Sequence, residues 1–166
     1  TLEDMEIQVS TGRVVDFRAK AALAFESNGK TVPLIYPVHF ENGYIVWPKP
    51  GKKPNYLMVA PNTESLLVPA GNYVLVKRFS AKEERRRVAA AVCDPNRLPG
   101  DDYGFENHLN YFHRRGNGLP ILLAKGLAAY LNSTLVDAYF RQFSGHTQVN
   151  AADLRSLKYP DLETLD

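Results

Sequence analysis

The sequence predicts an α+β fold: a twisted sheet of mixed or antiparallel strands over about residues 32–113, backed by C-terminal helices over about 119–143 and 150–157. The helices are indicated by apolar residues at every fourth position from Leu123 to Phe143, which share one helix face. The sheet is indicated by short runs of β-branched and aromatic residues between glycine-, proline- and asparagine-containing turns. All 166 residues are expected to form one domain, since this length supports one hydrophobic core.

The N-terminal part is predicted to be a segment followed by a helix. Residues 1–12 are expected to lead into a turn that ends at a glycine. Residues 14–25 favour a helix, because Val14 and Phe17 fall roughly on one side and Asp16 stands near its start.

A strand and a hairpin are predicted next. Residues 32–40 form the strand, and Pro33 and Pro37 within it favour an edge or bulged strand, because proline cannot donate a hydrogen bond to a ladder. The sequence Glu-Asn-Gly at 41–43 is typical of a hairpin turn, from which the chain returns through residues 44–47.

The middle of the chain alternates loops and strands. The sequence PKPGKKP at 48–54 predicts an exposed, semi-rigid loop that either grips phosphates or is a solvated connector. A short strand is expected at 56–60. Residues 71–79 predict the clearest strand, apolar on both faces as in the centre of a sheet. Small residues at 88–93 predict a strand against which a helix can pack, and alternation over 105–113 predicts another strand.

The C-terminal helical region is predicted to contain a break and capping residues. A break is expected at Asn132-Ser133, because Ser133 can cap a second helical segment. Gly145 is expected to end that segment in a left-handed conformation. Asn150 can cap the following short helix, which Pro160 prevents from continuing.

Composition narrows the class of protein. A net charge of +2 says little about nucleic acid, but residues 77–87 hold six basic and two acidic side chains. Cys93 is the one cysteine of the sequence, which excludes an intrachain disulfide and favours a reducing, cytoplasmic location. The sequence has no apolar run of about 18 residues, so no membrane span is expected. The first residue is Thr1 and not methionine, so the chain is expected to be part of a longer protein.

An ordered pattern of motifs runs through the chain. LNS at 131–133 is followed by GxTQxN at 145–150 and DLxxLxxP at 153–160, and the chain opens with VSTGRVVDFR at 9–18 and PLIYPVHFENGYIVWP at 33–48. With these motifs the chain resembles the C-terminal target-recognition domain of adenine-N6 DNA methyltransferases from restriction–modification systems. More loosely, it resembles the repeated block of type I specificity subunits.

The resemblance implies sequence-specific recognition of double-stranded DNA, which would position the duplex for the enzyme's own N-terminal catalytic domain. S-adenosylmethionine is then the cofactor of the full-length enzyme, and no cofactor is expected in this chain. In agreement, the sequence lacks the [N/D]PP[Y/F] motif that holds a flipped adenine. The nearest string, Asp94-Pro95-Asn96, lacks the second proline and the aromatic ring. No catalytic residue is therefore expected here.

A reader of duplex DNA needs polar side chains for base edges and cations for phosphates. The base-edge candidates are Arg13, His39, Tyr44, Asn107, His108, Asn110, His146 and Gln148. The phosphate candidates are Lys49, Lys52, Lys53, Lys77, Arg78, Lys82, Arg85, Arg86, Arg87, Arg114 and Arg115. The structural residues of the C-terminal motifs are Asn132, Ser133, Gly145, Thr147 and Asn150.

Two other functions remain as alternatives. One is a type I specificity-subunit-like domain that binds DNA and docks methylase subunits. The other is a stand-alone nuclease, which needs acids and a lysine around magnesium, although no tight acid-x-lysine pair is present. His108 and His113 supply too few ligands at that spacing for zinc, so no metal site is expected.

Overall fold

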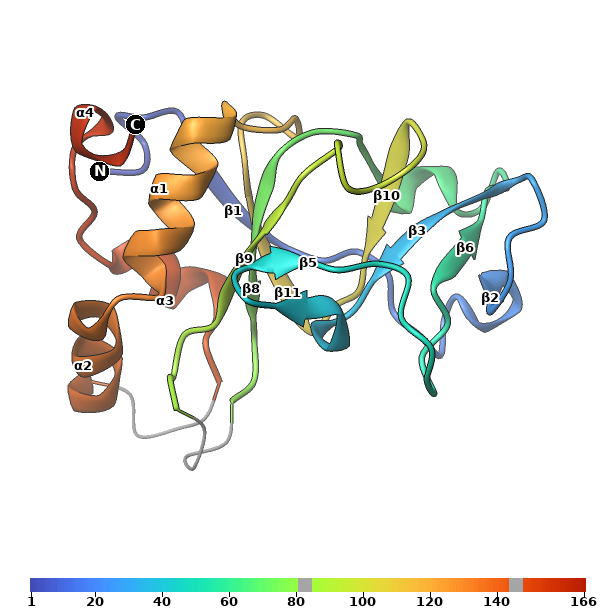
Figure 1. Ribbon diagram of the computed structural model, residues 1–166, viewed down its shortest axis with the longest axis horizontal. Coiled ribbons are helices and arrows are strands. Elements are labelled where there is room, and N and C mark those ends of the chain that lie inside the picture. Colours follow the sequence, from blue (N-terminus) through green and yellow to red (C-terminus); the bar gives the residue numbers. More distant parts are fainter. Residues whose placement is uncertain (81–84, 144–147) are drawn as a thin grey trace.

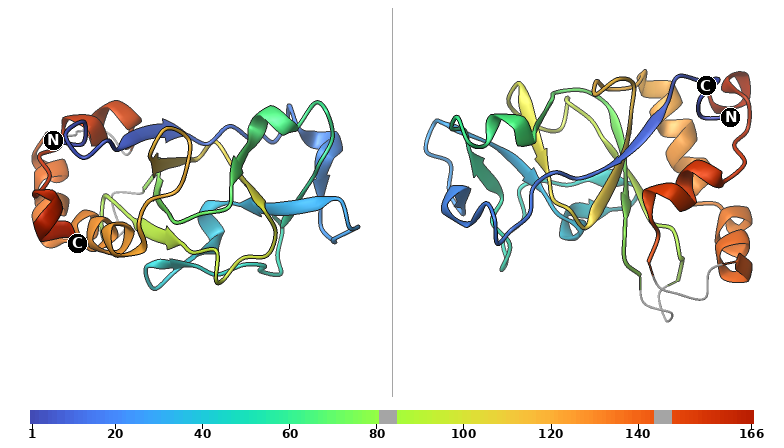
Figure 2. Two further views of the ribbon diagram at one scale, coloured as in Figure 1. Left: turned by 90° about the horizontal axis from the view of Figure 1, so that it is seen from above. Right: turned by 180° about the vertical axis from the view of Figure 1, so that it is seen from behind.

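The computed structural model describes residues 1–80, 85–143 and 148–166. Their architecture is α+β, as predicted, and it consists of three layers (Figure 1). A six-stranded sheet lies in the middle, helices cover its outer face, and a five-stranded sheet packs on the other face. Both chain termini lie on the helical side (Figure 2). Among the described residues, no helix is both long and apolar enough to cross a bilayer.

The six-stranded sheet has the order β1-β11-β8-β9-β5-β4. Its strands are β1 Gln8–Thr11, β4 Phe40–Glu41, β5 Tyr44–Ile45, β8 Tyr73–Lys77, β9 Ala90–Cys93 and β11 Leu109–His113. Neighbours are antiparallel except for β5 and β9, which pair in parallel. The predicted hairpin is confirmed, since β4 and β5 are joined by two residues with positive φ. The predicted central strand is confirmed as β8.

The five-stranded sheet has the order β2-β6-β3-β10-β7. Its strands are β2 Leu23–Ala24, β3 Thr31–Ile35, β6 Tyr56–Met58, β7 Leu67–Pro69 and β10 Asp102–Phe105. Of the two predicted alternatives, an edge strand or a bulged strand, the edge strand was wrong, because β3 lies between β6 and β10. Pro33 is tolerated there since the register with β10 begins one residue later, at Leu34. The strand is also shorter than predicted, since it ends at Ile35 and Pro37–His39 form a 3₁₀ helix.

Two further predictions were wrong. Residues 14–25 form no α-helix but turns, the short 3₁₀ helix Lys20–Ala22 and β2. The amide of Val14 instead donates to the carbonyl of Phe105 (3.0 Å), so a non-local contact overrides the local pattern. Residues 105–113 are not one strand, because β10 and β11 belong to different sheets. Further 3₁₀ helices are Pro37–His39 and Glu64–Leu66.

The helices are α1 Ile121–Leu131, α2 Thr134–Phe143, α3 Ala151–Ser156 and α4 Leu162–Leu165. The predicted break at Asn132-Ser133 is confirmed. It shifts the buried face by one position, so that Val136 is buried while Leu135 is 70% exposed. Asn150 begins α3 as predicted, and its amide donates to Asp153 (2.8 Å). The helix α4 was not predicted.

Candidate nucleic-acid interface

Loops from both sheets meet on one face of the molecule. The segment after β8 runs beside the turn between β10 and β11, since the amide of Arg78 donates to the carbonyl of His108 (2.9 Å). Residues 148–150, which precede α3, run along the other side of the segment after β8, since the amide of Val149 donates to the carbonyl of Arg78 (2.6 Å). Phe79 and Gln148 also form a bridge. Three segments far apart in sequence therefore meet on this face.

Several cationic and aromatic side chains project from these segments. The guanidinium of Arg78 donates to the carbonyl of Asn107 (2.6 Å) and lies 5.4 Å from the ring centre of Phe79. The ammonium of Lys77 lies 5.5 Å from the ring centre of Phe40. Arg85 is exposed and Arg86 half-buried. Arg78 of the basic run is thus held beside the turn between β10 and β11, whereas Lys82 lies outside the described residues.

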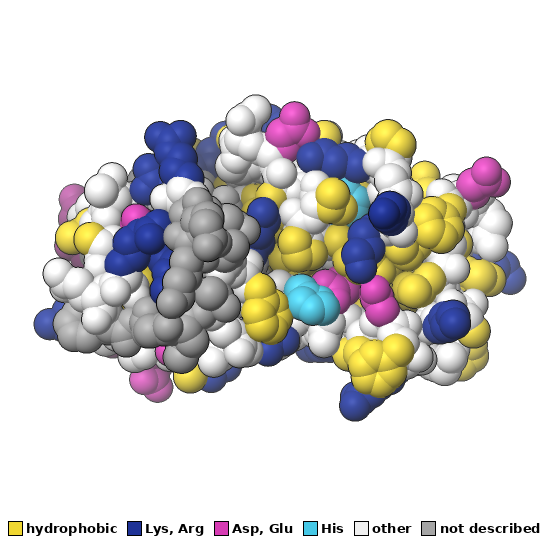
Figure 3. All heavy atoms as spheres, turned by 90° about the horizontal axis from the view of Figure 1, so that it is seen from below, with side chains coloured by type: hydrophobic (Ala, Val, Ile, Leu, Met, Phe, Trp, Pro, Cys, Tyr) yellow, Lys and Arg dark blue, Asp and Glu magenta, His cyan; other side chains and the backbone are white. Residues whose placement is uncertain are grey.

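Beside these cations lies a hollow of about 250 Å³, lined by Tyr36, Pro37, Val38, Lys53, Glu106 and His108. The carboxylate of Glu106 is almost fully buried, and it accepts hydrogen bonds from the amide (3.0 Å) and the Nδ1 of His108. The ring of His108 stays more than half exposed and lies 5.4 Å from the ring of Phe79. Figure 3 shows apolar side chains around a histidine on this face. The hollow therefore combines apolar surface with a fixed polar group.

The proline–lysine loop is held in place by Asn55. The side chain of Asn55 accepts from the amide of Lys49 (3.1 Å) and donates to its carbonyl (2.8 Å). The lysines of the loop are partly engaged, since Lys49 pairs with Glu41 (3.1 Å) and Lys53 with Asp16 (3.5 Å). Such surface pairs are worth at most about 1 kcal/mol, so a phosphate can compete for these lysines. Lys52 is exposed.

The structure removes His39 and Asn110 from the base-edge candidates, because both are fully buried. The Nδ1 of His39 accepts from the amide of Tyr36 (2.9 Å), so its Nε2 carries the proton that is donated to Asn55 (2.7 Å). Burial lowers the pKa of His39 and favours this neutral form. The side-chain Nδ2 of Asn110 donates to the backbone carbonyl of Val149 (3.0 Å). Both side chains therefore complete the interior of the domain.

Arg87 is also removed from the phosphate candidates, since the residue is buried and its amide donates to Asp137 (2.8 Å). Burial opposes ionisation of Asp137, but the hydrogen bonds from Arg87 and Arg141 hold its pKa below the usual range. The basic run at 77–87 could not reveal in the sequence that Arg87 is buried. Its burial depends on contacts with α2, which lies about 50 residues further along the chain.

The remaining candidates are dispersed. Tyr44 is half-buried beneath the guanidinium of Arg97, which lies 3.9 Å from its ring centre. Arg13 donates to the carbonyl of Ser65 (3.2 Å). Four of the residues singled out in the sequence lie outside the described residues: Lys82, Gly145, His146 and Thr147.

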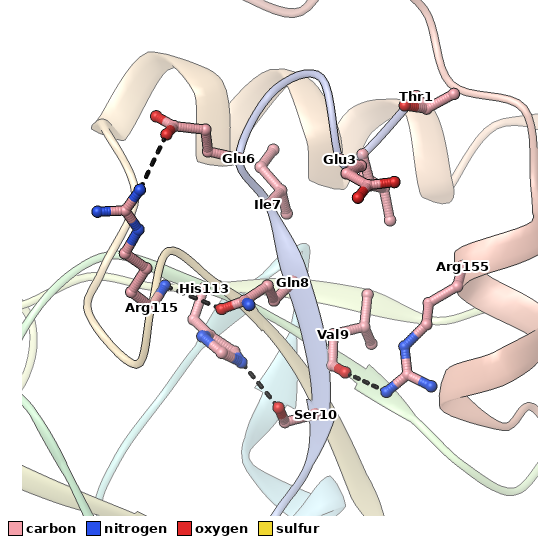
Figure 4. A pocket seen from close by; sticks show the side chains of 11 residues that line it. Thr1, Glu3, Glu6, Ile7, Gln8, Val9, Ser10, His113, Arg115 and Arg155 are labelled. Atoms are coloured by element: carbon pink, nitrogen blue, oxygen red, sulfur yellow. Dashed lines mark hydrogen bonds and ion pairs between the residues drawn. The ribbon is translucent and has the colours of Figure 1, made fainter.

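Arg114 and Arg115 lie at the opposite end of β11 from His108, so the phosphate candidates do not form one surface. Arg115 pairs with Glu6 (3.3 Å) beside an open pocket of about 780 Å³ (Figure 4). Arg155 on the rim of this pocket donates to the carbonyl of Val9 (2.6 Å), while Glu3 and Glu6 add negative charge. Glu3 and Glu6 thus offset part of the positive charge at this pocket.

Comparison with known proteins gives related sequences for the whole chain. It is 53% identical over 167 residues to the type II methyltransferase M.PstI of Providencia stuartii, a match that covers 100% of the chain. It is 50% identical over 165 residues to the type II methyltransferase M.BsuBI of Bacillus subtilis, which covers 99% of the chain. The chain spans 33% of the length of each of these relatives. No family model matches the chain, and no solved structure is significantly similar.

Proposed function

We propose that the chain is the target-recognition domain of an adenine-specific DNA methyltransferase of a restriction–modification system. The proposal is supported by the similarity of the whole chain to one third of each of two type II methyltransferases. In this proposal it binds double-stranded DNA and presents one adenine to a catalytic domain that precedes it in the full-length enzyme. That catalytic domain binds S-adenosylmethionine. The sequence supports this division, since it lacks the motif that would hold a flipped adenine.

The observation that carries the proposal is the face on which loops from both sheets converge. Lys53 lines an apolar hollow on this face, Arg78 is held beside the turn that carries His108, and Lys77 lies next to Phe40. Lys52, Arg85 and Arg86, from the neighbouring loop segments, complete the proposed set of phosphate contacts. Cations on the rim position a duplex through its phosphates, while groups at the centre are left to contact bases. Loops that a rigid sheet holds in place are a common location for such binding residues.

The test measures the affinity for duplex DNA as a function of salt concentration. It uses the complete protein that is encoded by the open reading frame containing this chain. If about five phosphates are neutralised, log affinity should fall against log salt with a slope of roughly −4 to −5. Lys52→Ala and Arg85→Ala should each weaken binding to every duplex and reduce the slope by about 1. Arg115→Ala, at the other end of β11, is the matched control and should leave both unchanged. Salt-independent binding, or equal effects of all three variants, would refute the proposed face.

A further inference from the structure

The pairing of His108 with Glu106 is more elaborate than a turn requires. Glu106 exposes only 2% of its side chain, yet it stands at the surface hollow and holds both the amide and the ring of His108. A carboxylate cannot donate, so the hydrogen between the two side chains is on Nδ1 of the imidazole. With Nδ1 engaged, Nε2 is the polar atom through which the exposed half of the ring meets a ligand.

The charge of the pair decides what Nε2 can recognise. A buried carboxylate is strongly penalised unless a cation accompanies it, and His108 is its ion-pair partner. As the cation of this ion pair, the imidazole carries hydrogen on both nitrogens, and its Nε2–H is then a hydrogen-bond donor. In the major groove, the acceptor that adenine and guanine share is N7.

The surroundings favour a base over a phosphate as the partner of His108. Phe79 is 45% exposed and Val38 is 52% exposed, and both stand beside the ring or line the same hollow. Apolar side chains beside a hydrogen-bond donor can contact the stacked bases and the methyl group of thymine. The ring of Phe79 also lies against the imidazole at an interplanar angle of 53°, while Glu106 holds the Nδ1 edge.

We propose that His108, oriented by Glu106 and braced by Phe79, donates from Nε2 to N7 of one purine in the recognised DNA sequence. His108 is thus a specificity-determining residue, and Glu106 is a positioning residue that fixes the ring. This inference rests on the proposed function and adds to it the atom that is read.

The test combines protein and DNA substitutions in one cycle. Duplexes selected from a randomised pool by the complete protein first define its site. Each purine of that site is then replaced singly by its 7-deaza analogue, which lacks only the N7 acceptor. One of these replacements should lower the affinity of the unmodified protein about tenfold, the size expected for a charged hydrogen bond. The same replacement should have no further effect on His108→Ala.

The controls separate this inference from the proposed function. Glu106→Gln should weaken the coupling to that purine while the protein keeps its general affinity for duplexes. Lys52→Ala should lower affinity for all duplexes and keep the full tenfold effect of the 7-deaza base. If no purine couples to His108, or if His108→Ala weakens all duplexes equally as a phosphate contact would, the inference is overturned and the proposed function still stands. If the unmodified protein binds no duplex, the proposed function itself fails.

Discussion

Replacing Asn132 with alanine is expected to destabilise the fold by about 2–4 kcal/mol, because its side chain substitutes for a missing strand. The amide of Ala90 donates to Oδ1 of Asn132 (2.9 Å), and Nδ2 donates back to the carbonyl of Ala90 (2.9 Å). The neighbouring strand β5 pairs with β9 only at Val92, so Ala90 has no strand partner on that side. Each buried backbone group left unpaired costs about 1–3 kcal/mol, so two would cost about 2–6 kcal/mol, and partial access to water keeps the expected loss in the lower part of that range.

The assay is urea unfolding of Asn132→Ala against the parent, with thermal unfolding as a second measurement. For a chain of this size the loss corresponds to a fall in Tm of roughly 5–15 °C. Ser133→Ala is the matched control: Ser133 accepts from the amide of Val136 at a long 3.4 Å, so its loss should cost only about 0.5 kcal/mol. Equal stability of Asn132→Ala and the parent would show that the paired bonds to Ala90 do not hold α1 to the sheet.

Two further predictions concern stability. Burial lowers the pKa of His39 and of His113, so the unfolded chain takes up protons first; stability should be full above the ordinary histidine pKa of about 6.5 and decline as pH falls below it. Urea midpoints that are equal at pH 7.5 and pH 6 would contradict this neutral state. Gly126→Ala should lower the Tm although alanine favours helices, because the new Cβ would stand 1.7 Å from the carbonyl oxygen of Leu165 and displace α4. A Tm that rises, as helix propensity alone would give, contradicts this packing.

Local patterns predicted the parts of the fold that local interactions determine. The helix break at Asn132-Ser133, the hairpin and the central strand β8 all follow from turn chemistry and from apolar runs of adequate length. The strict four-residue repeat places Leu135 on the buried face of α2, but Val136 is buried instead. The reason is that the break before α2 starts a new helix, which does not continue the rotation of α1. Polar residue type alone predicted DNA contacts for His39 and Asn110. It could not show that their hydrogen-bond partners lie inside the protein, since those partners are 16 and 39 residues away in sequence.

The segment at residues 12–14, at the start of the region that was wrongly predicted to be a helix, holds the candidate interface in place. Residues 12–14 pass beside the turn between β10 and β11, where the amide of Gly12 donates to the carbonyl of Leu109 (2.8 Å) and the amide of Asn107 donates to the carbonyl of Val14 (2.8 Å). The approach is so close that a Cβ on Gly12 would lie 2.2 Å from the carbonyl oxygen of Glu106. A glycine is therefore required at this position for steric reasons. Because the N-terminal segment clamps this turn from behind, the carboxylate of Glu106 and the ring that it holds have a fixed position relative to both sheets.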